Sequence, residues 1–522
     1  METANPLVNT AEVGDDGERS KRETPKGIIP RRRYRIAMVC DFFYPRLGGV
    51  ENHIWSLSQH LLRLGHKVIV ITHAYGSHNR KGVRYLGGEG AVDGGIYPLK
   101  VYYCPILPMT DQVALPTFTA TLPLLRWIFL RERIQIVHAH QATSTMANES
   151  IVYASMLGLA SVYTDHSLFG LNDVASVILN RVLQTTLSTV NAAICVSNAC
   201  RDNLILRTHL NPAKFRVIPN AVDPFKFSPA STITNSGDRS SSSENLSPFF
   251  LNQQRNDGRI RVIVISRLVY RKGVDLLVAI IPNLCRQMDH VDFVIGGDGA
   301  KLLNVQEMVE RERLQERVQL VGAVPHAHVR DVLITGQVFL NCSLTESFCI
   351  AVLEAACCGL RVVSTNVGGL PEVLPHDIML LAKPNVPDML ETLKHAIQLQ
   401  SDPATALDPV QTHERVKHMY SWSRVAQETA QVYDGIVQSL ERDGTLRQRS
   451  LRHRLACYRR LGTITGIVVC FLAVTVELWL CLVSWWQPSD QIDIVPDLTT
   501  ESECEREYSN QFCNESNDKK IS

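Results

Sequence analysis

The sequence predicts an α/β protein with two Rossmann-like domains facing each other across a cleft, followed by one C-terminal transmembrane helix. Short apolar runs alternate with helix-length segments in both halves, which is typical of parallel sheets covered by helices on both faces. Residues 230–258, rich in serine and asparagine and without periodicity, separate the halves as a predicted flexible linker. The apolar residues 461–486 predict the membrane helix, because a bilayer span needs about 20 such residues.

Length and composition narrow the possible classes of protein. A chain of 522 residues is too long for one compact domain. Its net charge of +1 gives no field that favours nucleic acid, so we expect no nucleic-acid partner. The 14 cysteines include no short-spaced metal-type pair, and we expect reduced thiols facing the cytosol. Residues 1–33 are polar and charged, which predicts a disordered leader and no signal peptide.

The first domain is predicted to span residues 34–229. Its strand-like runs are Arg35–Cys40, Lys67–Thr72, Lys100–Cys104, Ile134–His138, Ser161–Thr164, Ala193–Ser197 and Phe215–Ile218. After the first run, Gly48 and Gly49 precede a helix with Ile54, Leu57 and Leu61 on one face. Strand, glycine pair and helix can bring backbone N–H groups to a phosphate or sugar. A simple strand-to-helix turn would have the same sequence.

Polar side chains gather where the strands of the first domain are predicted to end, and ligands bind beyond the carboxyl ends of such strands. These residues are Asp41, His138, His140, Asp165, His166, Ser197 and Asn220. A lone histidine is more often structural than catalytic, but three histidines near strand ends favour a functional role. The proline-interrupted apolar residues 105–133 predict either a buried helix of this domain or a segment resting on the membrane.

The second domain, residues 259–412, contains the most informative stretch, Leu340–Gly359. A short strand is predicted to lead into a helix that begins near Ser347, with Glu346 at its start. Glu354 follows about two turns later on nearly the same side. The helix N-terminus suits a phosphate, and two carboxylates can hold sugar hydroxyls. Two glutamates at this spacing are also common on a solvated helix face.

The neighbouring motifs favour the functional interpretation. Arg267 and Lys272 follow a strand in V-I-S-R-L-V-Y-R-K-G, Gly297 lies in V-D-F-V-I-G-G-D-G, and Gly368-Gly369 end another buried strand. Together these motifs resemble the donor-binding half of retaining glycosyltransferase family 4, which has the GT-B fold. Two glutamates separated by seven residues are the signature of that family.

The C-terminal part predicts attachment to a membrane. Residues 413–440 form a closing helical region, 441–460 a basic juxtamembrane segment, 461–486 the span and 487–522 a short acidic tail. The arginines before the span predict a cytosolic N-terminal part and a lumenal tail. Glu477 is the single charge in the span and is expected to face a partner helix. Asn514 would be a glycosylation site in a lumenal tail, whereas the Asn341 sequon should stay unmodified.

A finer resemblance covers roughly residues 33–486. It rests on T-D-H-S-L-F-G (164–170), V-I-P-N-A-V-D-P (217–224), S-R-L-V-Y-R-K-G (266–273), S-L-T-E-S-F-C (343–349) and V-G-G-L-P-E-V-L-P (367–375). These motifs resemble the PIG-A family, the catalytic subunits of phosphatidylinositol N-acetylglucosaminyltransferase. The resemblance implies transfer of N-acetylglucosamine from UDP-GlcNAc to phosphatidylinositol with retention, the first step of GPI-anchor synthesis. It also implies the cytosolic face of the endoplasmic reticulum membrane and a complex with other subunits.

The resemblance also implies roles for particular residues. Arg267 and Lys272 would pair with the diphosphate, and backbone near Gly48, Gly49, Gly297, Phe348 and Cys349 would approach the donor. Glu354 would accept hydrogen bonds from the ribose, Glu346 would contact the transferred sugar, and His140 a sugar hydroxyl. The acceptor-binding residues stay unknown, with Asp165 and His166 as candidates. No cofactor and no metal are expected, since the resemblance implies a front-face mechanism assisted by the leaving phosphate.

Three alternatives remain open from the sequence. Another membrane-linked family 4 enzyme, such as a mannosyltransferase, would carry much the same donor motifs. A non-catalytic GT-B scaffold subunit would not need intact Glu346, Glu354, Arg267 and Lys272. A sugar-nucleotide epimerase of the same fold would not need a membrane span.

Overall fold

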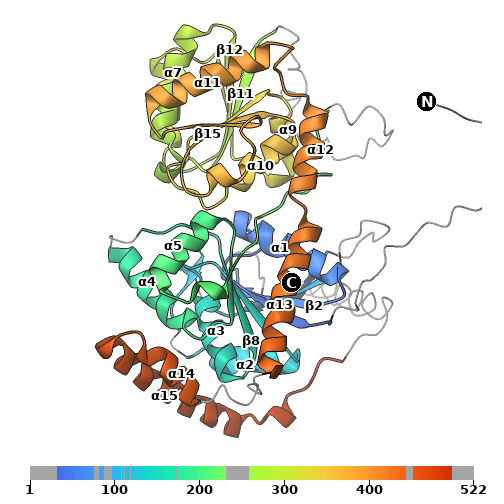
Figure 1. Ribbon diagram of the computed structural model, residues 1–522, viewed down its shortest axis with the longest axis vertical. Coiled ribbons are helices and arrows are strands. Elements are labelled where there is room, and N and C mark those ends of the chain that lie inside the picture. Colours follow the sequence, from blue (N-terminus) through green and yellow to red (C-terminus); the bar gives the residue numbers. More distant parts are fainter. Residues whose placement is uncertain are drawn as a thin grey trace, which may run out of the picture. The chain divides into compact units, whose positions relative to one another are not determined.

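A computed structural model (Figure 1) describes residues 32–46, 48–75, 81–87, 97–106, 108–110, 112–117, 119–170, 174–230, 258–442 and 451–496. The chain divides into Met1–Arg33 and Tyr34–Ser522, and every helix and strand named below belongs to the second unit. The predicted leader up to residue 31, nearly all of the linker insert, residues 443–450, and the tail beyond 496 with Asn514 lie outside the described residues.

The first sheet has eight strands in the order β10-β9-β8-β7-β1-β2-β4-β3. They are β1 (Arg35–Val39), β2 (Lys67–His73), β3 (Gly82–Leu86), β4 (Leu99–Cys104), β7 (Ile136–His140), β8 (Ala160–Asp165), β9 (Ala192–Cys195) and β10 (Phe215–Val217). All neighbours pair in parallel except β3 and β4, which are antiparallel. The parallel sheet is confirmed, and β3 is an antiparallel edge strand that the sequence analysis did not predict. A separate two-stranded ladder joins β5 (Pro108–Thr110) and β6 (Val113–Ala114).

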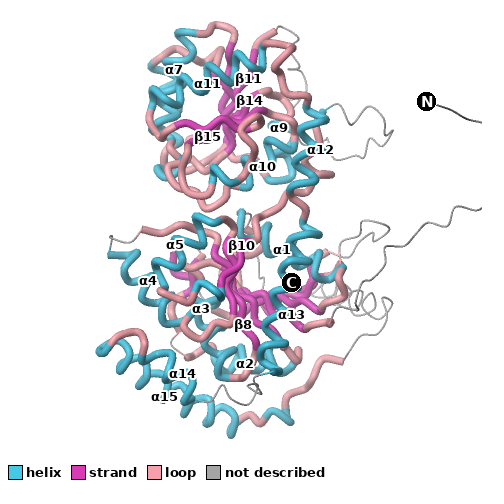
Figure 2. Tube along the Cα trace, viewed as in Figure 1, coloured by secondary structure: helices cyan, strands magenta, loops and turns pink. Residues whose placement is uncertain are grey.

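Helices flank this sheet (Figure 2). They are α1 (Gly49–Arg63), α2 (Leu122–Arg131), α3 (Thr145–Met156), α4 (Val174–Leu187) and α5 (Asn198–Thr208). The predicted apolar face of α1 is confirmed, since Ile54, Leu57 and Leu61 are almost fully buried. Helix α2 buries Leu122, Leu125, Ile128 and Phe129, so residues 122–131 form a buried helix of this domain.

The second sheet has six strands in the order β13-β12-β11-β14-β15-β16, all paired in parallel. They are β11 (Ile260–Ile265), β12 (Val291–Gly296), β13 (Val318–Gly322), β14 (Val338–Asn341), β15 (Arg361–Thr365) and β16 (Met379–Ala382). Its helices are α7 (Val274–Gln287), α8 (Leu302–Arg311), α9 (Val329–Leu333), α10 (Ile350–Cys357) and α11 (Val386–Ser401). A second α/β domain with a parallel sheet is therefore confirmed.

Helix α10 begins at Ile350, so the prediction that it begins near Ser347 was wrong. Cys349 precedes it with φ at 68°, in the left-handed region, which the right-handed helix cannot include. Glu346 therefore lies in the loop between β14 and α10, and helical spacing does not determine where its side chain points.

Each sheet reverses its strand order at one point. In the first sheet β1 lies between β2 and β7, and in the second β11 lies between β12 and β14. Ligands of open parallel sheets bind beyond the carboxyl ends of the strands at such a switch point. The loops that follow β1, β7, β11 and β14 are therefore where a ligand site is expected, and they carry most of the sequence-predicted site residues.

After the second domain, α12 (Pro409–Met419) leads to α13 (Trp422–Arg442), which packs back on α1 and β8 of the first domain. The hydroxyl of Tyr433 lies 2.7 Å from Nδ1 of His138, and the Tyr34 hydroxyl donates to Asp434 at 2.7 Å. The predicted closing helical region thus completes the first domain.

The last helices, α14 (Leu451–Arg459) and α15 (Thr463–Trp486), pack against each other. Helix α15 is long and apolar enough to cross a membrane by length and composition. Arg454 of α14 forms an ion pair with Glu477 of α15. The partner that Glu477 faces in the structure is therefore a helix of its own chain.

The segment after α15 also contacts the first domain. Arg126 of α2 donates to the carbonyl of Gln487 at 2.9 Å, and Arg131 pairs with Asp493 at 2.9 Å. Leu480 of α15 joins the apolar cluster that contains Leu125. For α15 to cross a bilayer with its end in the lumen, these polar contacts must separate.

Candidate active site

Lys272 and Glu346 form an ion pair at the switch point of the second sheet. Lys272 ends the 3₁₀-helix Tyr270–Lys272 after β11, and Glu346 lies in the loop after β14. The Ser343 hydroxyl donates to the same Glu346 oxygen at 3.0 Å. Burial disfavours the ammonium, but the Glu346 carboxylate outweighs burial and raises the pKa of Lys272. The result is a fixed cation beside a carboxylate, which suits a sugar joined to a phosphate.

Glu354 lies in α10 and is largely buried. Nε2 of His326 lies 3.0 Å from its carboxylate, and Nδ1 of His326 lies 2.6 Å from Nζ of Lys226. Burial lowers the pKa of Lys226, and the negative charge of Glu354 opposes that shift. Lys226 and His326 were not predicted from the sequence, since nothing in the local pattern links either of them to a glutamate of α10.

Arg267 is exposed and follows β11. The carboxylate of Glu51, on the first turn of α1, turns back so closely that a Cβ on Gly48 would lie 2.4 Å from its Oε2. Burial raises the pKa of Glu51, whereas its own backbone N–H, Arg267 and Arg46 act to lower it. The Glu51 carboxylate thus occupies the position at the N-terminus of α1 where Gly48 and Gly49 were predicted to bind an anion.

Several glycines let loops of the second domain approach each other closely. A Cβ on Gly273, with φ at 69°, would lie 1.8 Å from the carbonyl oxygen of Cys342. A Cβ on Gly297, with φ at 147°, would lie 1.9 Å from the carbonyl oxygen of Ser266. Gly273 therefore lets the loops after β11 and β14 approach each other closely, and Gly297 does the same for the loops after β11 and β12. Phe348 is buried against Tyr420, so its side chain contributes packing, and what it can offer a ligand is backbone.

Loops of the two domains meet beside this site. Ser347 of the second domain donates a hydrogen bond to the carbonyl of His166 in the first domain. Within the second domain, the N–H of Gly369 donates to the carbonyl of Glu346 at 2.9 Å. The Glu372 carboxylate accepts from the backbone of Asn198 and Ala199 at 2.7 and 2.9 Å. Glu372 thereby caps the N-terminus of α5 from the other domain. The two predicted Rossmann-like domains are brought together at the carboxyl ends of their sheets.

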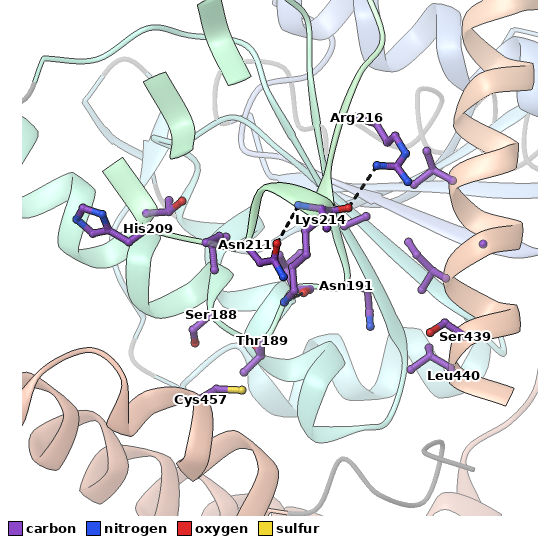
Figure 3. A pocket seen from close by; sticks show the side chains of 18 of the residues that line it. Ser188, Thr189, Asn191, His209, Asn211, Lys214, Arg216, Ser439, Leu440 and Cys457 are labelled. Atoms are coloured by element: carbon purple, nitrogen blue, oxygen red, sulfur yellow. Dashed lines mark hydrogen bonds between the residues drawn. The ribbon is translucent and has the colours of Figure 1, made fainter. Parts of the chain in front are cut away.

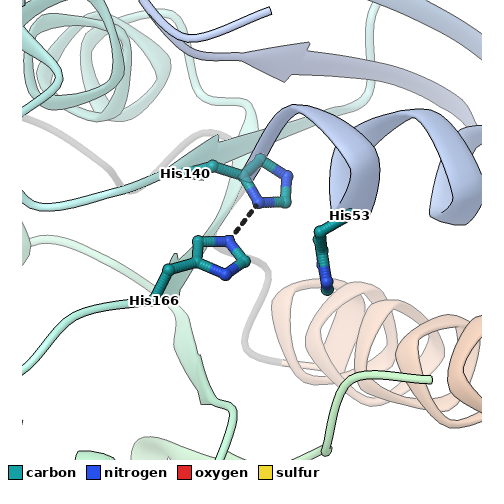
Figure 4. A group of neighbouring side chains, drawn as sticks. All are labelled: His53, His140 and His166. Atoms are coloured by element: carbon teal, nitrogen blue, oxygen red, sulfur yellow. Dashed lines mark hydrogen bonds between the residues drawn. The ribbon is translucent and has the colours of Figure 1, made fainter. Parts of the chain in front are cut away.

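On the first domain, four histidines form a cluster where β7 and β8 end, with His53 contributed by α1 (Figure 4 shows three of them). The rings of His138 and His140 lie 4.2 Å apart, and Nδ1 of His140 lies 3.2 Å from Nε2 of His166. His53 of α1 lies against His166, with ring centroids 4.6 Å apart. His140 is fully buried, whereas His166 is partly exposed. A ligand could therefore reach His166 more easily than His140.

The cluster is neutral at physiological pH. Burial lowers the pKa of His53 to about 4, and burial with repulsion from His53 lowers that of His138 to about 3. The pKa values of His140 and His166 fall well below the usual range for the same two reasons. These side chains therefore serve as neutral donors and acceptors, since none carries a proton as a cation near pH 7.

Asp165, a predicted acceptor candidate, forms a fully buried ion pair with Arg207 at 3.2 Å. Burial raises the pKa of Asp165 to about 6, and the Arg207 charge opposes that shift. The Arg207 guanidinium lies 4.7 Å from the ring of Phe169. Asp165 and Arg207 thus anchor the loop that carries His166, and Asp165 itself is not accessible to a substrate.

A cavity of about 1100 Å³ lies away from these loops (Figure 3). It is bordered by Asn191 and Lys214, which directly precede β9 and β10, and by Cys457 of α14. It is therefore at the amino-terminal edge of the first sheet, opposite to the edge where the switch-point loops meet. Its size does not make it the active site, since its lining contains none of the residues that carry the donor chemistry.

Comparisons with known proteins match this architecture. The family model of PIGA (GPI anchor biosynthesis) matches residues 73–173, and that of glycosyl transferases group 1 matches residues 249–408. A phosphatidylinositol N-acetylglucosaminyltransferase subunit of Arabidopsis thaliana is 46% identical, over 89% of this chain and 95% of the relative. The subunit of the same name from Homo sapiens is 45% identical, over 90% of this chain and 88% of that relative. Sucrose-phosphate synthase from Thermosynechococcus elongatus has the same fold, with a TM-score of 0.61 and 18% identity over 78% of this chain and 100% of that structure.

Two α/β domains joined at the carboxyl ends of their sheets, with a lysine–glutamate pair at the switch point of the second, define a GT-B glycosyltransferase. The chain belongs to the PIGA family of phosphatidylinositol N-acetylglucosaminyltransferase subunits.

Proposed function

We propose that the protein transfers N-acetylglucosamine from UDP-GlcNAc to phosphatidylinositol with retention of configuration, as the first step of GPI-anchor synthesis. The observation that carries the proposal is the Lys272–Glu346 ion pair at the switch point of the donor domain, in a chain of this family. In this proposal Lys272 would stabilise the charge that develops on the diphosphate leaving group, and Glu346 would accept a hydrogen bond from a sugar hydroxyl. Resemblance to the named subunits supports the choice of donor and acceptor.

In this proposal the diphosphate is held by charge and backbone. Lys272 donates to the phosphate as a point charge while remaining beside Glu346, and Arg267 contributes a bidentate fork. The exposed side chain of Arg267 is free to turn from Glu51 toward the donor. Backbone N–H groups at Cys349 and at Gly48-Gly49 complete the cradle once Glu51 moves aside. Glu354, held by His326, accepts from the ribose hydroxyls.

The sugar ring is placed against Glu346 and the histidine cluster. Because His140 is fully buried, we place it behind His166, where its ring orients the partly exposed imidazole that meets the sugar hydroxyl. No nucleophilic side chain is assigned, and the leaving phosphate itself accepts the proton of the incoming inositol hydroxyl. We propose that no metal ion is needed for this step, because Lys272 and Arg267 supply the positive charge.

The acceptor lipid and the membrane set the location that we propose. The protein would lie in the endoplasmic reticulum membrane with both α/β domains on the cytosolic face, where phosphatidylinositol presents its inositol. Helix α15 would hold the active site close to the surface. Other subunits of the transferase would assemble with this chain, as the names of its relatives indicate for those proteins.

The test uses microsomes that lack the endogenous transferase and are supplied with this chain and its partner subunits. Labelled UDP-GlcNAc, UDP-Glc and GDP-Man are offered in parallel, and the labelled lipid is identified after extraction. We expect N-acetylglucosaminyl-phosphatidylinositol from UDP-GlcNAc alone. Label from GDP-Man would move the protein to another family 4 reaction, and no label from any donor would favour a scaffold subunit.

The kinetics of site variants test whether these residues carry out the transfer. Lys272→Ala should lower kcat/KM by about 10²–10³, since a group that stabilises transition-state charge is lost. Glu354→Gln should act mainly on KM for the donor, because it contacts the nucleoside. Lys301→Ala is the matched control, since Lys301 pairs with Asp275 in an exposed ion pair of the same domain. Equal loss in the control variant would argue against the proposed role of Lys272.

A further inference from the structure

The three imidazoles of His53, His140 and His166 have the geometry of a metal site (Figure 4). One ring nitrogen from each lies within 4.8 Å of the other two. A zinc ion binds histidine nitrogen at about 2.0–2.1 Å, so tetrahedral ligands lie about 3.3 Å apart. Nδ1 of His140 and Nε2 of His166 already lie 3.2 Å apart. His53 completes the set if its ring moves by at most about 1.5 Å.

His53 supplies a second, independent observation. Its Nδ1 lies 2.7 Å from the Asn220 side-chain oxygen, which fixes the ring as the Nδ1–H tautomer. Its Nε2 is buried and has no hydrogen-bond partner among the residues that the structure describes. A buried ring nitrogen with a free lone pair is costly unless something binds it. Metal-ligating histidines in proteins are oriented by the same kind of contact that Asn220 makes, a hydrogen bond to the ring nitrogen away from the metal.

We propose that His53, His140 and His166 form a binding site for a divalent transition-metal ion, with Zn²⁺ as the expected occupant, and that the bound ion inhibits sugar transfer. Neutral imidazole is the ligand that Zn²⁺, Cu²⁺ and Ni²⁺ prefer. In the metal-free chain one of the two facing nitrogens carries the hydrogen of the His140–His166 contact, so metal binding moves that hydrogen to the outer nitrogen of its ring, Nε2 of His140 or Nδ1 of His166. Three protein ligands leave the fourth position of a tetrahedral ion for water.

The inhibition follows from the position of the ligands. His140 and His166 end β7 and follow β8, at the edge where the proposed function places the transferred sugar. A metal ion held by both rings fixes the imidazole of His166, which the proposed function places against a sugar hydroxyl, and puts a double positive charge beside it. The metal is therefore a competitor of the substrate and not part of the reaction, so transfer should be insensitive to a chelator when no metal is added.

Co²⁺ binding to the full-length chain in detergent tests the site without an activity readout. We expect the visible absorption of four-coordinate Co²⁺, its displacement by Zn²⁺, and a rise in the unfolding temperature with Zn²⁺. His53→Gln should bind at least about tenfold more weakly, and Asn220→Ala should weaken binding by about tenfold through loss of the hydrogen bond that orients His53. His60→Gln is the control, because His60 lies on the same helix α1 and bonds only locally, to the carbonyl of Ser56 and to Arg63.

The activity arm uses microsomes with Zn²⁺ added and then removed by chelation. Inhibition that is reversed by the chelator supports the proposal if the Zn²⁺ concentration for half-inhibition rises at least about tenfold in His53→Gln, with each protein compared with its own activity in the absence of Zn²⁺. Equal inhibition of the wild type, His53→Gln and Asn220→Ala would show that the ion binds elsewhere and would overturn the proposal. Absence of the Co²⁺ spectrum in the wild-type chain would overturn it irrespective of activity.

Discussion

Glu372 of the second domain caps helix α5 of the first, with its two carboxylate oxygens 2.7 and 2.9 Å from the backbone N–H groups of Asn198 and Ala199. A carboxylate at a helix N-terminus is stabilised by the unpaired N–H groups and by the helix dipole. Here the cap and the helix belong to different domains, so the contact joins the two halves that must enclose the donor.

Replacing Glu372 with alanine should weaken this closed arrangement. We expect the loss of about 1–3 kcal/mol of interdomain contact and a fall in kcat/KM, because an open cleft lets water compete for the donor. Steady-state kinetics with UDP-GlcNAc, together with the rate of donor hydrolysis, would measure the effect. Asp408→Ala is the matched control, since Asp408 caps α12 locally at Val410 and Gln411. Unchanged kinetics in Glu372→Ala would show that the contact does not govern closure.

The histidine cluster should make stability depend steeply on pH below neutrality. The pKa of His53 is lowered to about 4 and that of His138 to about 3, so the folded chain stays unprotonated where the unfolded chain, at about 6.5, takes up protons. The unfolded state thus binds more protons, and the free energy of unfolding falls as pH drops from about 6.5 to 4. Each such histidine contributes up to roughly 1.4 kcal/mol per pH unit.

Asp165 acts in the opposite direction in the same range. Its pKa is raised to about 6, so the folded state holds a proton that the unfolded carboxyl has released above about pH 4. Unfolding temperatures from pH 8 to 5 should therefore fall with decreasing pH, but less steeply in His53→Gln. His418→Gln should match the wild type, since His418 is largely exposed. A pH-independent unfolding temperature would contradict neutral burial of the cluster.

Much of the fold was predictable because strand periodicity and loop composition are local signals. The runs beginning at Arg35 and Lys67 correspond to β1 and β2 within one residue at each end. The antiparallel β3 was missed, since an exposed or half-buried edge strand carries no continuous apolar run. The helix start near Ser347 was wrong because the left-handed backbone of Cys349 is not a property that sequence alone reveals.

Part of the candidate site was predictable for a similar reason. Lys272 and Glu346 were both assigned to the donor from their sequence motifs, and the structure brings them together at one switch point. His326 and Glu51 were missed, since their partners depend on how separate elements pack. His140 was predicted to lie near a ligand because it ends a strand. Its burial by His138, His166 and Met38 could not be predicted, because it depends on tertiary packing.

Two glycines with similar backbone angles should respond very differently to alanine. Gly273 has φ at 69° and no room for a side chain, because a Cβ would lie 1.8 Å from the Cys342 carbonyl oxygen. Gly82 has φ at 77°, and a Cβ added there would have no atom of the described residues within 4 Å. We expect Gly82→Ala to cost about 1 kcal/mol of stability, from backbone strain alone. Gly273→Ala should cost several times more and abolish donor binding, as measured by chemical unfolding and by stabilisation with UDP. Equal costs would show that the loop can relax.

Asn514 provides a test of membrane orientation. If α15 crosses the bilayer with the tail in the lumen, Asn514-Glu515-Ser516 should be glycosylated in microsomes and shift in mobility until treated with an endoglycosidase. Asn514→Gln is the control for the shift. The Asn341 sequon should stay unmodified, since its side chain is buried in β14 and donates to Ser364.

The opposite result would also be informative. An unmodified Asn514, in a tail that protease reaches from the cytosolic side, would favour the contacts of Arg126 with Gln487 and Arg131 with Asp493 persisting in the membrane-bound protein. Helix α15 would then lie along the membrane and the predicted lumenal tail would be wrong.

Helix α13 has a consequence for the order in which the protein is made. Its Tyr433 contacts His138, 295 residues earlier in the chain, and its Asp434 accepts from Tyr34 across 400 residues. The first α/β domain therefore lacks one of its helices until the whole second domain has left the ribosome. During synthesis the first domain therefore stays incomplete, and the surface of α1 that α13 covers stays exposed. The second domain can fold in the meantime, because its chain is continuous. The nascent chain thus finishes its first domain last.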